Sequence, residues 1–442
     1  MKAESAGFPS ASVICEGFAA QGSATAAGLG MGNLPMAAIP GHVDLQTDKE
    51  LQKNVEVVLV DQIIRDLTVQ PGETKLQPEP KPRDIVFEGT LDEVHRFFYM
   101  NEWSDGLPII LPTIAKVEEF LKYTDRPADA MIGVLLPDKR EATVWNIAVN
   151  GVMAGCRPEY MPVLVAIVEV MADPQFGQEH LGQTPGTEVL ITINGPIIKD
   201  LGFNYEQGAL RVGFQANTSI GRFWRLYLRN VAGFLPHRTD KATFGGTWRV
   251  VLAENEDVVA NIGWEPMSVD QGFKAGDNVV TINSCTSTDL VASVGGAIAE
   301  EILDRLAARI VDIQIHMFLA SRWGLGVRPQ ILLSPCVAQA IAQGGYSKDK
   351  VRQYLYEHAR FQAKRLEQLR PDCGLLCDVV KQGKLPKQYC ESEDPNRLVP
   401  IVLSADDFMI TVSGDLARDN CFICAQNGYI GYPVSKKIQL PA

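Results

Sequence analysis

The chain has 442 residues, enough for two or three domains that each bury a hydrophobic core. Its formal net charge is −12 and it has no dense run of Lys or Arg, so it is not expected to bind nucleic acid. We find no secretory signal and no apolar stretch long enough to span a membrane. We therefore expect a cytoplasmic protein whose nine scattered cysteines are reduced thiols.

The first 67 residues predict a partial α/β unit. SASVICEGF is almost continuously apolar, as is typical of a strand covered on both faces, and LPMAAIPG is similar. A helix of small and polar residues is expected between them. Residues 48–67 have helical periodicity, with Val57, Val60, Ile64 and Leu67 on one face. Residues 68–84 are rich in Pro and charge and are expected to form a linker.

Residues 85–390 predict a large α+β domain. Helices are expected to begin at the caps Thr90 and Thr143 and at Pro158. TEVLITINGP and RPQILLSP read as buried strands, and the segment from STDLVAS to FLASRW reads as a helix that can break at its Gly pair. Residues 391–442 return to strands, among them DFMITVSGD and the segment beginning CFIC.

The predicted fold is therefore α/β with an incomplete parallel sheet at the N-terminus. Two parallel strands and two helices do not make a stable sheet by themselves. The C-terminal strands, residues 391–442, or another polypeptide would complete the sheet. The alternative is a small appendage packed on the large domain.

GFPSASVICEGF and LPMAAIPGHV, followed by a charged helix, resemble the UGSC family of (seleno)proteins, which are distantly similar to the selenoprotein catalytic subunits of glycine-type reductases. DGLPIILPT, AVNGVMAGCRPEYMPV, ANTSIGR and MITVSGD resemble the large domain of longer members. The resemblance implies a selenocysteine or cysteine followed by Gly-Ser-Cys shortly before the first strand. That motif is absent from MKAESAGFPSA. Either it was lost, or, as we expect, a small subunit carries it and completes the sheet in a hetero-oligomer.

Three candidate catalytic residues follow the two N-terminal strands. Cys15 and Glu16 lie at the end of the first strand, and His42 follows the second. Ligands of open α/β sheets bind beyond the carboxyl ends of the strands. A thiol, a carboxylate and an imidazole in one crevice would suit thiol activation or proton delivery. The alternative is a buried strand cysteine with a surface Glu and His.

A second candidate thiol, Cys156, lies between two predicted helices in AVNGVMAGCRPEYMPV. The following helix N-terminus and Arg157 would stabilise its thiolate or bind a substrate carboxylate. Glu159 would pair with Arg157 or act as an acid, and Asn150 is a further candidate for substrate binding. The alternative is a tight turn with a small buried cysteine.

The helix ANTSIGRFWRLYLRNVAGF carries Arg222, Arg225 and Arg229 on one face, with Asn217 or Thr218 as its cap. The arginines would form either structural ion pairs or an anion-binding wall. The other candidates for substrate binding are polar side chains near this cap and in the turn after TEVLITINGP: Asn217, Ser219 and Asn194.

The remaining cysteines support weaker hypotheses. Cys421 and Cys424 form a CxxC pair, but in a strand their side chains would point to opposite faces. Cys373, Cys377 and Cys390, with His358, are considered as a zinc site, although their spacing matches no standard pattern. We therefore expect no metal, and the sequence identifies no cofactor.

The sequence predicts the large subunit of a heteromeric enzyme that acts on a small, anionic substrate. The expected reaction is a thiol-assisted reduction or the cleavage of a carbon–heteroatom bond. A hydrolase or lyase that uses the same crevice is an alternative, and a non-catalytic assembly subunit is another.

Overall fold

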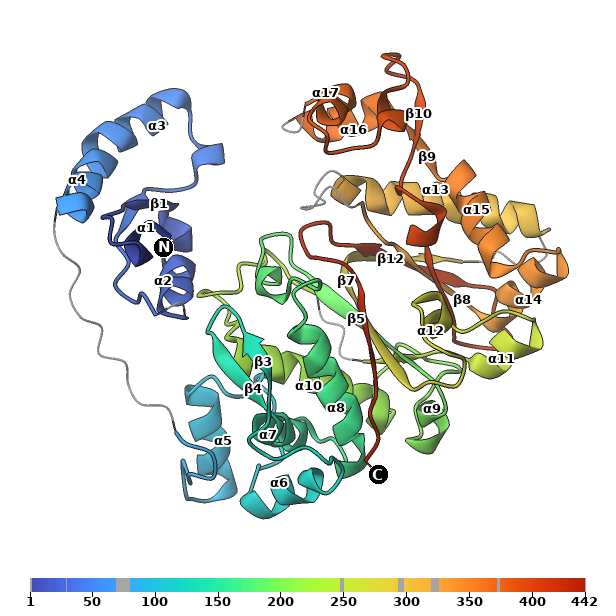
Figure 1. The fold of residues 1–442 in the computed structure, drawn as a ribbon, viewed down its shortest axis with the longest axis horizontal. Helices are drawn as coiled ribbons and strands as arrows, with labels where there is room; N and C mark the ends of the chain where they lie inside the picture. Colours follow the sequence, from blue (N-terminus) through green and yellow to red (C-terminus); the bar gives the residue numbers. More distant parts are fainter. Residues whose placement is uncertain are drawn as a thin grey trace.

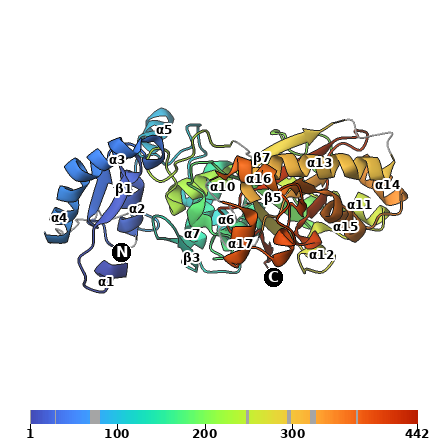
Figure 2. The same ribbon diagram turned by 90° about the horizontal axis from the view of Figure 1, so that it is seen from above.

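The computed structural model describes residues 2–28, 30–68, 80–246, 250–292, 298–318, 326–371 and 374–441. The fold is mixed α/β, as predicted. Figures 1 and 2 place an N-terminal unit, residues 2–68, at one end of the long axis of the molecule. The rest of the chain is built around one mixed sheet, with a group of helices near each end of it.

The N-terminal unit contains a two-stranded parallel sheet in which Cys15 lies opposite Ile39. Its elements are α1 (Lys2–Ser5), β1 (Ser12–Cys15), α2 (Ala19–Gly28), β2 (Met36–Ile39), α3 (Asp48–Asn54), the π-helical η3 (Val55–Leu59) and α4 (Val60–Thr68). Thr47 and Glu50 form a capping box that starts α3. Helix α3 runs through η3 into α4, which packs on β2.

The helix η3–α4 is apolar on two sides, and only one of them is covered. Leu59 is buried with Ala37 and Ile39 of β2. The predicted stripe faces away from this cluster, and its side chains are 40–65% exposed: Val57, Val60, Ile64 and Leu67. The N-terminal unit therefore leaves a substantial apolar surface in solvent.

The large sheet has the strand order β11-β8-β12-β7-β5-β6, and β13 also pairs with β7. The pairs β5–β6 and β8–β11 are parallel, and the other pairs are antiparallel. The strands are β5 (Glu188–Asn194), β6 (Leu252–Ala253), β7 (Val279–Val291), β8 (Gln330–Leu333), β11 (Met409–Val412), β12 (Cys421–Gln426) and β13 (Val434–Lys437).

Two sequence expectations are corrected by this sheet. The C-terminal strands β11, β12 and β13 belong to it, so they do not complete the N-terminal sheet. In addition, residues 287–291, which were predicted to start a helix, continue the strand β7 because they pair with β12. Tertiary pairing overrides the weak local preference of such a segment.

One group of helices packs around α8 against β7 and β13. These elements are α5 (Leu91–Met100), α6 (Ile114–Leu121), β3 (Met131–Leu135), β4 (Arg140–Thr143), α7 (Val144–Ala154), α8 (Met161–Met171), α9 (Ile197–Asp200) and α10 (Gln215–Tyr227). The caps Thr90 and Thr143 are confirmed, each in a capping box. Helix α10 begins at Gln215, earlier than predicted, so Asn217 and Thr218 lie inside its first turn.

The other group packs around α13 against β7 and β12. It comprises α11 (Glu256–Asn261), α12 (Met267–Asp270), α13 (Ala299–Phe318), α14 (Pro335–Gln343), α15 (Lys348–His358), β9 (Arg360–Gln362), α16 (Ala363–Leu369), α17 (Leu376–Lys381) and β10 (Leu398–Pro400). Among the described residues, no helix is both long and apolar enough to cross a membrane.

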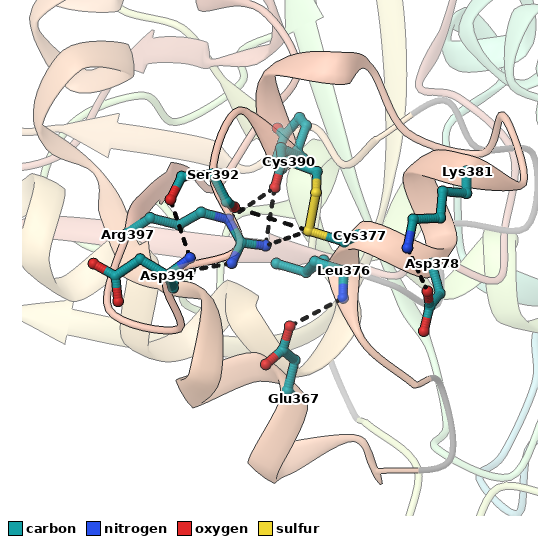
Figure 3. The surroundings of a disulfide bond; sticks show 10 residues. Glu367, Leu376, Cys377, Asp378, Lys381, Cys390, Ser392, Asp394 and Arg397 are labelled. Atoms are coloured by element: carbon teal, nitrogen blue, oxygen red, sulfur yellow. Dashed lines mark hydrogen bonds and ion pairs between the residues drawn. A yellow bond between two sulfur atoms is a disulfide. The ribbon is translucent and has the colours of Figure 1, made fainter.

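A disulfide joins Cys377 of α17 to Cys390 (Figure 3). Arg397 lies beside it and donates from Nη2 to Cys377 Sγ over 3.5 Å. The expectation of reduced thiols is therefore wrong for this pair. The zinc hypothesis is also wrong, because two of its proposed ligands are bonded to each other; Cys373 lies outside the described residues.

Candidate functional site

The N-terminal unit meets the large region at the carboxyl end of β1. Lys241 Nζ donates to the carbonyl oxygen of Gly17 over 2.9 Å, and it lies 5.9 Å from the centroid of the Phe18 ring. A cavity of about 650 Å³ opens at this point, with Gly17 on one side and residues of α10, η6 (Leu228–Ala232) and the following loop on the other. We call it the junction cavity.

Basic side chains dominate the wall contributed by the large region: Arg225, Arg229, His237 and Lys241. Arg225 is neutralised by Glu188, whose Oε2 accepts from its Nε over 2.6 Å. Arg229 donates from Nε to the carbonyl oxygen of Glu102, and partial burial lowers its pKa while Asp105 opposes that effect. A guanidinium starts from so high a pKa that it stays cationic near neutral pH.

Lys241 Nζ likewise donates to backbone carbonyl oxygens. Besides that of Gly17, its acceptor is the carbonyl oxygen of His237 at 3.2 Å. Within the described part of the chain, neither Arg229 nor Lys241 forms an ion pair with a carboxylate. Of the acidic residues that line the cavity, Asp105 is paired with Arg222, and Asp240 accepts from the backbone N–H of Ala242. Asp240 keeps its negative charge, so the Arg and Lys side chains of the described lining exceed the carboxylates by one. This small excess of positive charge suits a small anion.

The structure places Cys15, Glu16 and His42 at one edge of the two-stranded sheet. Cys15 ends β1 half-buried, packed against the apolar cluster beneath α4, and Glu16 is exposed in the next turn. His42 follows β2, accepts from the N–H of Asp44 at Nδ1 over 3.2 Å, and lies 5.9 Å from Phe18 between ring centroids. This is also the edge that carries Gly17 into the junction cavity.

Cys156 does not fit the role of an activated nucleophile. Gly155 ends α7 with φ +81°, and Cys156 N then donates back to the carbonyl oxygen of Gly151 over 3.0 Å. The side chain is only 9% exposed, and burial raises its pKa to about 12 although Ser219 and Arg222 oppose the rise. Burial therefore argues against the predicted stabilised thiolate, because desolvation outweighs the nearby positive charge.

The side chains beside Cys156 lie elsewhere than in the junction cavity. Arg157 is exposed, donates from Nη2 to the carbonyl oxygen of Leu201 over 3.3 Å, and covers the ring of Tyr160 at 4.9 Å. Glu159 is half-buried and forms no ion pair with Arg157 among the described residues. The two residues thus belong to the local packing of this turn.

The three arginines on one face of α10 and its continuation η6 do not share one role. The sequence left open whether they form structural ion pairs or bind an anion. Arg222 makes a structural ion pair with Asp105, donating from Nε and Nη2 over 3.1 and 2.9 Å, and Arg225 pairs with Glu188. Arg229 lines the cavity and, among the described residues, forms no ion pair with a carboxylate. The anion-binding role therefore remains for one of the three.

The predicted polar ligands on α10 are occupied by backbone groups. Asn217 is fully buried, donates to the carbonyl oxygens of Asn204 and Val251, and accepts from the N–H of Asn204. Ser219 donates to the carbonyl oxygen of Gln215 over 2.7 Å. These hydrogen bonds hold the start of the helix in place, and the assignment of Asn217 and Ser219 to substrate binding stays a prediction.

Asn194 ends β5 in a buried acidic cluster rather than in a pocket. Its Nδ2 donates to Glu254 Oε2 over 2.6 Å and to Glu256 Oε1 over 2.9 Å. Burial raises the pKa of Glu254, although Lys348 and three hydrogen bonds oppose the rise. Asn150 does line a cavity, but it is a second one, near α5 and α7.

The CFIC segment forms β12, and the predicted strand is confirmed. Cys421 and Cys424 are both buried, and burial raises the pKa of each thiol. Their three-residue spacing directs them to opposite faces of the strand. They do not form a disulfide with each other.

Sequence reasoning missed His237 and Lys241. The available signal was the density of positive charge from Arg222 to Lys241 in a chain with net charge −12. The loop after η6 showed no functional motif in the sequence, because Lys241 and Gly17, which it brings into contact, are 224 positions apart. Only the packing of the two units reveals that contact.

Residues 1–69 match the model of the UGSC family, which confirms that assignment for the N-terminal unit. The match ends at residue 69. The predicted linker, residues 68–84, lies mostly outside the described residues. No curated protein and no solved structure matches the chain.

Proposed function

We propose that the chain is the large subunit of a heteromeric enzyme that binds a small anionic substrate in the junction cavity. The proposal rests on one observation. Arg229 and Lys241, without carboxylate partners among the described residues, line a cavity where β1 of the UGSC unit ends. Open α/β sheets bind ligands beyond the carboxyl ends of their strands, and cations in a partly buried cavity attract anions strongly.

The proposed reaction is a thiol-assisted reduction or cleavage of a carbon–heteroatom bond. Cys15 supplies a thiol at this edge, and Glu16 or His42 takes up its proton. A reduction of this kind consumes two thiols: the carbon–heteroatom bond is replaced by a carbon–hydrogen bond, the heteroatom leaves with a proton, and the sulfurs form a disulfide. The second thiol, or both, would come from the small subunit that the family resemblance implies.

The geometry of the N-terminal sheet supports a partner that adds a strand beside β1. The outer edge of β2 is already occupied, because Gln62 Oε1 accepts from Ala38 N over 2.9 Å and Gln62 Nε2 donates to Ala38 O over 3.3 Å. Strand β1 pairs only with β2 within the described residues. Such an open edge is a ready template for another chain.

Anion binding tests the proposed site. Calorimetric titration with malonate as the probe should detect binding to the native chain, and Arg229→Met or Lys241→Met should each weaken it by about tenfold, equivalent to ~1.4 kcal/mol. Lys384→Met, which removes an exposed lysine outside the cavity, should leave the affinity unchanged. Equal affinity in all four proteins would contradict the site.

Native mass spectrometry tests the partner. The chain is co-expressed with the open reading frame next to its own gene, if that frame encodes a Cys-Gly-Ser-Cys-like motif. Ser12 N donates to Pro35 O on the β2 side, so the N–H of Val13 points to the open edge. Val13→Pro should abolish the complex and Val13→Thr should keep it. A chain that stays alone beside that partner argues against a heteromer.

A further inference from the structure

The junction cavity is larger than the small anion that its cations would hold. Its volume of about 650 Å³ is within the range in which proteins bind drug-sized ligands. Malonate, with its three carbons and two carboxylates, would fill only a small part of that space. The substrate proposed for this cavity therefore has room for a second group beside its anionic group.

The lining of the cavity includes apolar side chains as well as cations. Leu228 and Phe234 are only 3% and 7% exposed, so they form the deeper part of the wall. They lie next to each other, because the N–H of Phe234 donates to the carbonyl oxygen of Leu228 over 3.0 Å. The other apolar side chains of the lining are Pro236, Ala242 and Phe244. A second group on the substrate would therefore meet an apolar surface.

Phe244 differs from the other apolar residues of the lining because it is 97% exposed. Single exposed apolar side chains are common on protein surfaces, and exposure alone indicates nothing. What distinguishes Phe244 is its place, at the rim of a partly buried cavity that carries unpaired cations. An apolar side chain surrounded by polar residues at such a rim is typical of a ligand-binding surface.

The backbone is anchored on both sides of Phe244. Thr243 donates from its N–H and from Oγ1 to the carbonyl oxygen of Thr184, over 2.9 and 3.0 Å. The carbonyl oxygen of Gly246 accepts from Arg225 Nη2 over 3.2 Å. Phe244 is thus held between two fixed points while its ring stays uncovered. A ring that is already positioned loses little conformational entropy when a ligand packs on it.

The segments that position Phe244 also carry the cations of the cavity. Arg225, which holds Gly246, lies one helical turn before Arg229. Lys241 is three residues before Phe244 in the same loop, and its N–H donates to the carbonyl oxygen of Gly182 over 2.9 Å. The aromatic ring and the two cations therefore belong to the walls of one cavity, within reach of one ligand.

We propose that the substrate of the junction cavity is an aryl-substituted carboxylate, whose anionic group binds Arg229 and Lys241 and whose aromatic ring packs on Phe244. This inference rests on the proposed function and names its substrate class. Two aromatic rings attract each other beyond the effect of apolar burial. Phe244 is thus a specificity-determining residue, which favours aromatic over small aliphatic anions and takes no part in the chemistry.

The test uses malonate and benzylmalonate as matched probes, because they share two carboxylates and differ in the benzyl group. Calorimetry on the full-length native chain should show that benzylmalonate binds about tenfold more tightly. Phe244→Ala should reduce this ratio to about one, and Phe244→Tyr, which keeps an aromatic ring, should preserve it. Because the side chain is so exposed, neither change should affect folding.

Two further variants locate the bound probe. Phe8→Ala removes a phenylalanine that is 66% exposed and does not line the cavity, so the ratio should stay about tenfold. Lys241→Met removes a cation of the cavity and should weaken the binding of both probes.

The outcomes separate this inference from the proposed function. If neither probe binds, the anion site is wrong and the aromatic substrate with it. If malonate binds and benzylmalonate binds no more tightly, the anion site stands and the aromatic substrate is overturned. It is also overturned if Phe244→Ala leaves the ratio unchanged, or if Lys241→Met does not weaken benzylmalonate, since either result places the probe elsewhere.

Discussion

The chemical properties of single residues in this chain depend more on the residues packed around them in space than on their neighbours in sequence. Cys156 follows a helix end and precedes an arginine, yet the Val-rich helices on either side help to bury it, and burial raises the pKa of its thiol. Lys241 has an ordinary sequence context, yet it spans two units by donating to Gly17. The feature that identifies the candidate site is therefore the pair of cationic side chains, Arg229 and Lys241, that line a partly buried cavity.

Thiol labelling checks the contrast between Cys15 and Cys156. At pH 8, iodoacetamide should alkylate half-buried Cys15 at least about tenfold faster than Cys156, whose pKa of about 12 leaves almost no thiolate. Peptide mass spectrometry measures both rates in one sample. Comparable rates would show that Cys156 is activated.

The same raised pKa predicts a loss of stability in alkali. The unfolded chain ionises Cys156 near pH 9, while the folded chain keeps its proton until about pH 12. The contribution of this thiol is complete below pH 9 and falls as the pH rises toward 12. Denaturant unfolding of the native chain and Cys156→Ala should show a smaller decline for the variant in that window.

Glu254 illustrates a buried carboxylate with a structural task. Its two oxygens accept from the backbone N–H groups of Met267 and Val412 and from Asn194. Glu254→Gln would turn an N–H₂ group toward one of these donors and should lower the free energy of unfolding by about 1–3 kcal/mol. Glu393→Gln, at an exposed position, is the matched control and should have no effect.

At the scale of elements, the stability of a short helix depends on bonds to other parts of the chain. Helix α17 has six residues and is joined to η8 (Lys387–Cys390) by the disulfide between Cys377 and Cys390. Tyr389, next to this bond, is buried and donates to the carbonyl oxygen of Val402 over 2.9 Å. The disulfide thereby ties a surface helix to the core around α13.

Removing the disulfide should therefore destabilise this region. The bond spans 13 positions, for which chain entropy predicts about 2–3 kcal/mol. Cys390→Ser and reduction of the native chain should lower the free energy of unfolding by the same amount, measured in urea. Cys336→Ser changes a cysteine outside the bond and should not. Unaltered unfolding after reduction would contradict a stabilising role.

At the scale of the whole molecule, the junction cavity is lined both by Gly17 of the N-terminal unit and by residues of the large region, which the sequence predicts to be joined by a linker. Lys241 contacts the N-terminal unit through Gly17 and belongs to the loop that follows η6. Two of its three N–H groups are used by carbonyl oxygens, which leaves one for an anion. An anion bound there would hold the two units together.

Hydrogen exchange tests this coupling. Malonate should slow the exchange of amides in residues 12–18 of the native chain and have no such effect in Lys241→Met. The amides of α13, which lies in the other group of helices, serve as the internal control and should exchange at the same rate with and without malonate. Equal protection of both regions would indicate a general effect of the salt.

Periodicity and capping made much of the fold predictable. Thr90 and Thr143 start helices as expected, the strands β1 and β2 lie where apolar runs predict them, and the edge that carries Cys15 and His42 follows from their parallel pairing. These features depend on neighbouring residues, which a sequence displays directly. Residues 287–291 were misread because their structure depends on pairing with β12.

The sequence by itself determined many of the elements, the match of the N-terminal unit to the UGSC family and the places where polar residues follow strands. Tertiary structure decided which of them matter: it buried Cys156, satisfied Asn217, paired Arg222 and left Arg229 facing a cavity. The C-terminal strands pair within the large sheet, and among the described residues one edge of β1 has no partner strand. The physical reason is that burial, ion pairing and strand pairing depend on residues distant in sequence, whereas helix caps and apolar periods are local.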